Sequence, residues 1–260
     1  MKRHGCLLTS ILMYLLLSFC IASASGGSIQ SPAPNDASPL CRAFNEFNSL
    51  IRDGRVSKTN ARRELTDKLA EIRTEYYLRD GQDYPSTDWI FPVAGYDTRA
   101  IDSGKNHGYV PSGYDFFSGN RHGGHPAYDI FIRDQNQDSR DDRNGKTVNV
   151  LSMTGGIVVA LEKEWQPGSG LRGGKYIWVY DPGNGLLVYY AHNDELFVEL
   201  GTILRPGDFI ANIGRSGLNA AKRRSPTHLH FSVLRLINGQ PAPIPVYHEL
   251  QQVRSVLPQL

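Results

Sequence analysis

Apolar residues recur at intervals of three and four positions between residues 39 and 79. Two such stripes lie on either side of Gly54; their members are Phe44, Phe47, Leu50 and Ile51, and then Leu65, Leu69, Ile72 and Tyr76. These intervals place side chains on one face of a helix, and glycine disfavours helix continuation. The pattern predicts a small α-helical hairpin within a helical N-terminal region, residues 39–85, with a structural or interaction role.

After Pro85 the pattern changes to short runs rich in β-branched and aromatic residues. Three runs span residues 155–162, 175–180 and 186–192, and the sequence DPGNG between the last two is a strong hairpin signal. Further strands are expected within residues 205–214 and over 228–236. Short strands joined by glycine and proline turns predict a mainly β, antiparallel domain over residues 86–250.

The first residues have the pattern of an export signal. Lys2 and Arg3 precede an apolar run over residues 6–22, and a small-x-small cleavage site ends at Ala24. We expect a signal peptide over 1–24 and a flexible leader, rich in Ser, Pro and Gly, over 25–38. An uncleaved anchor is the alternative, although the run is near the lower length limit for a membrane span. The protein is therefore expected to be exported, periplasmic or secreted, with no stable membrane span after cleavage.

Charge and cysteine content restrict the chemistry. Loss of Lys2 and Arg3 with the signal leaves 26 basic against 26 acidic residues, which gives no support for nucleic acid as a partner. Cys41 is then the one remaining cysteine, so an internal disulfide and a cysteine-based zinc site are both excluded. Any metal must be bound by histidine and carboxylate. The sequence does not indicate the oligomeric state.

Two histidines alternate with apolar residues in the last strong β run. On a strand, Leu229, Phe231 and Val233 would face a core, whereas His228 and His230 would project together from the other face. Paired imidazoles can bind a metal, carry out acid–base chemistry, or divide these tasks. The alternative is a half-exposed strand that carries two polar histidines without a function.

His125 and Asp129 are a second candidate pair. Fully extended, the five residues would separate the ends by roughly 13 Å, too far for both side chains to bind one ion. Two glycines before His125, together with Pro126, allow the segment to bend. An ordinary loop histidine and a surface aspartate are the alternative, and His122 is the reserve ligand should His125 not serve.

His192 ends the run over residues 186–192. Strict alternation would place it on one face with Leu186, Val188 and Tyr190, at a point where the strand meets a loop. Functional groups are often carried at such places on a rigid support. The alternative is a histidine that bonds only to backbone.

In this order, the segments HPAYD, YYAH, GRSG and HLHF resemble the lysostaphin-type zinc endopeptidases of family M23, which cleave peptide cross-links in bacterial cell walls. FPVAG (Phe91–Gly95) is similar to the usual entry into that domain. LRPGDFIANIGRSG is similar to the glycine-rich turn and strand that precede H-x-H. The resemblance covers about residues 86–236 and excludes the helical region. H-x-H alone is a weak signal, but the ordered set is specific.

The resemblance implies one zinc ion bound by His125, Asp129 and His230, with His192 and His228 as the catalytic pair. It also implies an antiparallel β fold with a long narrow groove, and peptidoglycan stem peptides or cross-bridges as substrates. An exported zinc metalloendopeptidase is the resulting expectation.

Two alternatives to an enzyme are weighed. A non-catalytic module of this family, which binds the wall or activates other hydrolases, is expected to lack one or more of the five residues, and all five are present. A structural metal-binding domain would need a fourth protein ligand, whereas the motifs supply three.

The loop over residues 132–150 departs from the family pattern. Asp134, Asn136 and Asp138 alternate as in a calcium-binding loop, but Ser139 and Gly145 stand where such a loop needs glycine and a closing carboxylate. A solvated charged loop is favoured over calcium binding, and we expect it to shape one wall of the groove.

Overall fold

The structure is a computed structural model that describes residues 38–256. The predicted signal peptide, residues 1–24, and the leader as far as residue 37 lie outside the described residues. Within residues 38–256, none of the helices has both the length and the apolar character that crossing a bilayer requires.

The predicted helical hairpin is present as α1 (Pro39–Arg52) and α2 (Lys58–Leu78). The Ser38 hydroxyl accepts a hydrogen bond from the backbone N–H of Cys41, and proline occupies the first turn of α1, which favours initiation there. Gly54, with φ +68°, follows the end of α1 in the left-handed conformation that glycine adopts most readily. Both helices turn the predicted apolar stripes inward, apart from Leu50, which is half-buried.

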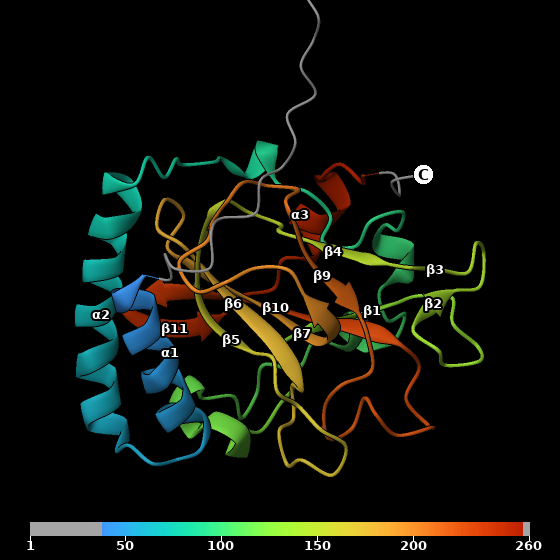
Figure 1. Cartoon of the computed structure of the whole chain (residues 1–260), viewed down its shortest axis with the longest axis horizontal. Helices are drawn as coiled ribbons and strands as arrows, with labels where there is room; N and C mark the ends of the chain where they lie inside the picture. The colour runs from blue at the N-terminus through green and yellow to red at the C-terminus, as the bar shows by residue number, and fades with distance from the viewer. Residues whose placement is uncertain (1–37, 257–260) are drawn as a thin grey trace, which may run out of the picture. The chain divides into compact units, whose positions relative to one another are not determined.

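The rest of the described chain is built on a nine-stranded sheet in which all strand pairs are antiparallel (Figure 1). Its main path runs β1-β10-β7-β6-β5-β8, while β9 pairs with β7 and β4, and β11 pairs with β10. The strands are β1 (Tyr128–Phe131), β4 (Asn149–Leu151), β5 (Gly156–Glu162), β6 (Lys175–Asp181), β7 (Leu186–Leu196), β8 (Ile203–Leu204), β9 (Phe209–Ile213), β10 (His228–Ile237) and β11 (Gln240–Pro243). The expected mainly β, antiparallel class is confirmed.

Short elements complete the fold. A separate two-stranded ribbon joins β2 (Arg140–Asp141) to β3 (Lys146–Thr147), and α3 (Tyr247–Gln252) follows the sheet. Four 3-10 turns precede β1: η1 (Ser86–Asp88), η2 (Thr98–Ala100), η3 (Lys105–Gly108) and η4 (Phe116–Arg121).

The two faces of the sheet belong to different hydrophobic cores. Leu229, Phe231 and Val233 of β10 lie in a core with residues of the 89–110 segment, β4, β9 and α3, as their alternation predicts. On the opposite face, α1, α2 and η4 pack over β5, β6 and part of β7 (Figure 1). The helices therefore cover part of the face that also carries His228 and His230.

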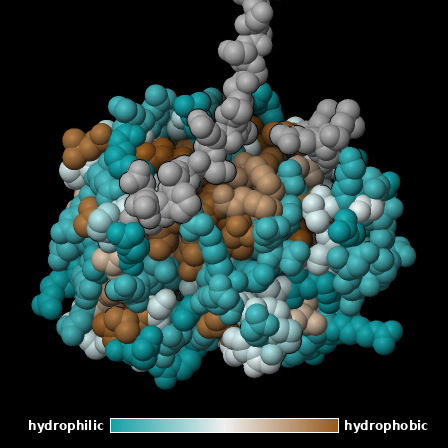
Figure 2. Space-filling view, viewed as in Figure 1, coloured by the Kyte–Doolittle hydropathy of each residue, from teal (hydrophilic) through white to brown (hydrophobic). Residues whose placement is uncertain are grey.

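Polar residues dominate the outside of this arrangement. Figure 2 shows hydrophilic residues over most of the visible face, with apolar side chains gathered mainly near its centre. Few large apolar side chains of the described residues are well exposed, and Leu78 at the end of α2 is the most exposed of them, at 80%. The apolar stripes read from the sequence are thus largely used in packing.

The charged loop between β1 and β4 is organised by its own hydrogen bonds. Asp134 is buried, and its carboxylate accepts bonds from the backbone N–H groups of Asp138 and Ser139 and from the Thr227 hydroxyl. Its oxygens are therefore engaged in holding the loop, and the preference for a solvated charged loop over calcium binding stays a prediction.

Candidate active site

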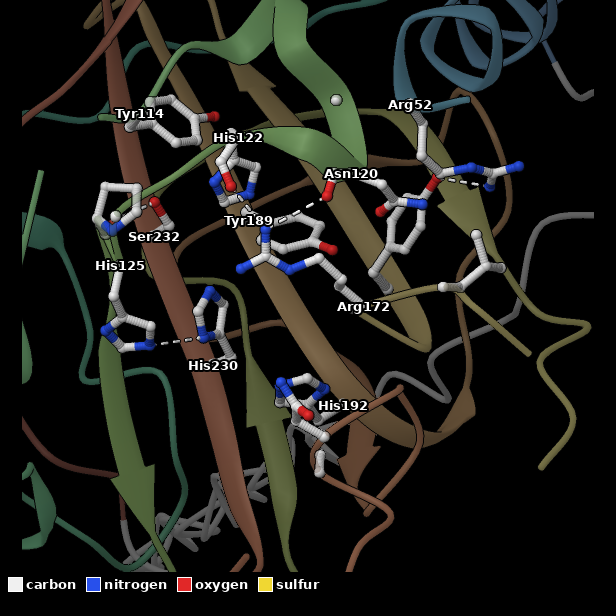
Figure 3. Close-up of a pocket in the computed structure, with 18 of the residues that line it drawn as sticks. Arg52, Tyr114, Asn120, His122, His125, Arg172, Tyr189, His192, His230 and Ser232 are labelled. Carbon is white, nitrogen blue, oxygen red and sulfur yellow. Dashed lines mark hydrogen bonds between the residues drawn. The ribbon is translucent and has the colours of Figure 1, made fainter. Parts of the chain in front are cut away.

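A His–Asp–His cluster forms where β1 meets β10. The strand register places Asp129 opposite His230, and a short bridge between Val110 and His125 brings His125 to the same edge. His125 Nε2 lies 3.2 Å from His230 Nδ1 and 3.3 Å from Asp129 Oδ1, and His230 Nδ1 lies 3.0 Å from that oxygen (Figure 3). The chain between His125 and Asp129 therefore bends as their spacing requires.

The three donor atoms fit a single zinc ion. Ligands about 2.1 Å from a tetrahedral zinc lie about 3.4 Å from each other, close to the three separations in this cluster. The Nδ1–H of His125 donates to the carbonyl of Gly108 at 2.9 Å, which leaves the Nε2 lone pair directed at the cluster. Within residues 38–256, this is the group of histidine, cysteine and acidic residues with metal-binding geometry.

The charges of the cluster are strongly coupled. Burial alone would raise the pKa of Asp129, but hydrogen bonds from His125 and His230 and the charges of His230 and His228 outweigh it and hold that pKa well below its ordinary value. Burial lowers the pKa of His230 more than Asp129 raises it, so this imidazole has a lowered pKa. An ionised carboxylate beside a neutral imidazole is the protonation state that a divalent cation requires.

His192 reaches the cluster through a β-bulge. Tyr176 pairs with Ala191 and Lys175 pairs with Asn193, so His192 is the extra residue of β7, and its φ is +68°. A bulge bends the strand and redirects one side chain. The expectation that His192 ends the strand and shares a face with Leu186, Val188 and Tyr190 is therefore wrong, because β7 continues to Leu196 and those three residues lie in the opposite core.

His192 and His228 stand side by side next to the cluster. Their ring centroids are 4.9 Å apart. The ring centroid of His192 also lies 5.5 Å from that of His230, and Figure 3 labels these two residues. Each ring directs Nδ1 at a backbone carbonyl 2.8 Å away, that of Ser216 for His192 and that of Pro226 for His228. Because a carbonyl only accepts, each Nδ1 carries a proton, and the Nε2 of His228 lies 3.7 Å from Asp129 Oδ1.

Burial has a large effect on the pKa of His192. Its loss of hydration, added to the nearby charges of His228 and His230, lowers the pKa of His192 well below the ordinary value. The ring is therefore neutral near pH 7. A neutral, oriented imidazole with a free Nε2 is suited to accept a proton.

A cavity of about 300 Å³ opens beside the histidines and extends to α1. Its walls include Tyr176, Trp178 and Tyr189 from the sheet and Ile51 from α1. The volume lies at the lower end of the range for small-ligand pockets. The sequence reasoning missed this aromatic wall, although Tyr176 and Trp178 alternate along β6 and so share a face.

His122 and His107 lie outside the ligand cluster. His122 lines the cavity, but its Nδ1 bonds to the Gly123 carbonyl at 2.8 Å, and the three-residue metal cluster does not include it. His107 stacks on Tyr247 with centroids 3.6 Å apart. His122 is therefore not needed as a ligand in place of His125.

These features define a β-sheet domain with a histidine-rich site of the kind found in metallopeptidases. Residues 140–243 of the 260 match the model of peptidase family M23, so this part of the chain is similar to that family. The matched part contains His192, His228 and His230, and the fold adds His125 and Asp129 from the preceding segment. No curated protein sequence matches the chain.

Several solved structures are similar to parts of the chain. A zinc-containing peptidase from Vibrio cholerae is 20% identical, with a TM-score of 0.38, over 68% of this chain and 41% of that one. A LytM protein from Ruminococcus gnavus is 25% identical, with a TM-score of 0.42, over 65% and 64% of the two chains. Lysostaphin from Staphylococcus simulans is 18% identical, with a TM-score of 0.38, over 62% and 55%. The chain thus spans less than two thirds of the length of each of these proteins.

Proposed function

We propose that this protein is an exported zinc metalloendopeptidase that hydrolyses peptide bonds in peptidoglycan cross-links. The proposal rests mainly on the convergence of His125, Asp129 and His230, whose donor atoms lie 3.0–3.3 Å apart, beside two further histidines. The match of residues 140–243 to peptidase family M23 supports the reaction class. Peptidoglycan as the substrate is supported by the resemblance of the ordered motifs to the lysostaphin type.

His125, Asp129 and His230 are proposed to hold one zinc ion, which when bound would act as a Lewis acid toward a water molecule and the substrate carbonyl. His192 and His228 would divide the remaining tasks. One accepts a proton at Nε2 and returns it to the leaving amine. The other donates a hydrogen bond to the oxygen that gains negative charge, a contribution typically worth about 3 kcal/mol.

The test uses purified cell walls and the zinc-loaded protein. We expect the walls to clear, a chelator to stop clearing, and zinc to restore it. Mass spectrometry of the released peptides identifies the bond that is cut. Wall binding without any bond cleavage would instead support a non-catalytic regulatory module and would contradict the proposal.

The proposal includes the layout of the chain: a signal peptide over residues 1–24, a leader, a helical region and a peptidase domain over 86–250. N-terminal sequencing of protein recovered outside the cytoplasm tests the first part. A mature chain that begins at or near Ser25 supports export with cleavage, whereas retention of Lys2 and Arg3 contradicts it.

A further inference from the structure

The cavity beside the histidines is closed on one side by the helical region. Ile51 and Arg52 of α1 line it, together with Tyr176 and Tyr189 from the sheet and Arg172 from the loop between β5 and β6. Figure 3 shows Arg52 on the side of the cavity away from His125, and it shows Arg172 crossing the middle with its guanidinium near His122. A peptide bound at the histidines would therefore have the two arginines within the same cavity.

The two arginines differ in how their charges are balanced. Arg52 pairs with Asp53 at 2.8 Å and with Glu162 at 3.0 Å, and it also bonds to the Tyr176 hydroxyl. Arg172 forms no ion pair with any carboxylate of the described residues, although it is half-buried. A guanidinium remains charged at all physiological pH values. The cavity therefore holds one positive charge that has no carboxylate partner in residues 38–256.

One edge of the Arg172 guanidinium is already in use. Nη1 donates to the carbonyl of His122 at 2.8 Å and to that of Asn120 at 3.4 Å (Figure 3). These bonds tie the loop that carries Arg172 to the η4 segment and fix the plane of the guanidinium. Nε and Nη2 have no hydrogen-bond partner among the described residues. This is the edge that binds a carboxylate through two parallel hydrogen bonds.

We propose that this cavity binds a free carboxylate of the substrate peptide and that Arg172 is its anion-binding residue. Aromatic rings, including that of Trp178, would pack against the adjoining apolar part of the peptide. This inference rests on the proposed function, because it names the chemistry by which the same site selects its peptide. The carboxylate has two sources in a stem peptide, the α-carboxylate of a γ-linked glutamate and the C-terminal carboxylate.

Three matched peptides distinguish these sources. The probes are the tetrapeptide L-Ala-D-isoglutamate-L-Lys-D-Ala, its isoglutamine analogue, and its C-terminal amide. Calorimetric titration into the zinc-loaded His228→Ala variant measures binding without turnover. We expect one of the two amides to bind about 10- to 100-fold more weakly than the parent acid, as loss of a charge-assisted pair predicts. Equal binding of all three peptides would overturn the inference.

Substitutions then assign the effect to Arg172. Arg172→Gln, in the same zinc-loaded background, should reduce the preference for acid over amide to within about twofold, and Arg172→Lys should restore part of it. A merely structural role would weaken acid and amide alike and leave their ratio unchanged, a result that contradicts the assignment. Arg224→Gln is the matched control, since it removes one exposed positive charge next to Ser225 at the cavity wall and should keep the preference.

Cell-wall clearing by the wild type, measured in parallel, separates this inference from the proposed function. If the wild type clears cell walls but the peptides show no preference for acid over amide, only the proposed carboxylate site is overturned. Acid preference that depends on Arg172, without any bond cleavage, supports the site and overturns the peptidase activity.

Discussion

Gly217 tests whether His192 must be held in place for activity. Its φ is +115°, and a Cβ at this position would lie 2.5 Å from the carbonyl oxygen of Arg172 and 2.8 Å from Nδ1 of His192. Substitution by alanine therefore strains the backbone and pushes directly on the His192 ring. None of the three proposed zinc ligands is among the nearest atoms.

The expected effect of Gly217→Ala on the reaction rate follows from these distances. Ordinary contacts begin near 3.4 Å, so the His192 ring at 2.8 Å must retreat by about 0.6 Å. A displacement approaching 1 Å at a reacting group can cost about 100-fold in rate. The unfavourable φ costs about 1–3 kcal/mol of stability, or roughly 2–4 °C in Tm for each kcal/mol in a chain of this size. The contact with the backbone carbonyl oxygen of Arg172 adds to this cost. We expect Gly217→Ala to retain zinc, to lose a few degrees in Tm and to lose about 100-fold in kcat.

Two glycines in the loop before β6 separate the effect of backbone strain from the effect of the contact with the His192 ring. Gly168 has φ +91°, and a Cβ added there would meet no atom within 4 Å, so Gly168→Ala introduces backbone strain without a contact. Gly170 has neither feature, and Gly170→Ala should change little. Calorimetry, zinc content and hydrolysis of cell-wall peptides are measured for all three variants. If Gly217→Ala kept the turnover of Gly168→Ala, the ring position of His192 would not control the reaction and its proposed role would be wrong.

Three further outcomes are expected. His230→Ala should lose both zinc and activity, whereas His228→Ala should keep zinc and lose turnover; a full equivalent of zinc in the His230 variant would refute the ligand assignment. Phe44→Ala should destabilise the chain by about 3–5 kcal/mol, because its ring is 1% exposed, and thermal unfolding in a single lowered transition would check this. Burial raises the pKa of Asp141, but hydrogen bonds from Arg143 outweigh it and leave that pKa below its ordinary value. Its stabilisation is therefore complete above the unfolded-state pKa and lost as pH falls through the folded-state pKa, so Asp141→Asn should flatten the acid limb of a stability–pH curve, and an unchanged slope would contradict this.

Local periodicity predicted the fold well because each element buries one regular face. The stripe containing Phe44 and Ile51 did become the buried face of α1, and the alternation around Phe231 did separate a core face from a site face. The chain order of the histidine motifs also indicated the family, since each motif lies on or beside a strand of the same sheet. These predictions needed only the periods of helices and strands.

The orientation of His192 could not be read from alternation. A strict two-residue period assigns it to the face of Tyr190, but the bulge inserts one residue and reverses that assignment. The bulge is set by neighbours distant in sequence: a Cβ on Gly174 would lie 2.3 Å from the Ser216 carbonyl carbon, so two loops meet closely behind the histidine. The glycine-rich segment GRSG was the available signal, because glycine is favoured where backbones approach this closely.

The location of the helical region argues against a removable blocking segment. Phe44, Phe47 and Ile51 are each at most 3% exposed, and they share a core with Trp178 and Leu187 of the sheet. Exposing a large apolar side chain costs about 1.5–3 kcal/mol, so loss of α1 alone would cost a large fraction of the stability of an ordinary domain. It would also remove the wall of the cavity that faces the aromatic residues. A segment that completes both the core and the cavity would, under the proposed function, form part of the peptide-binding site. The peptide preference should then depend on residues outside the part that matches the family.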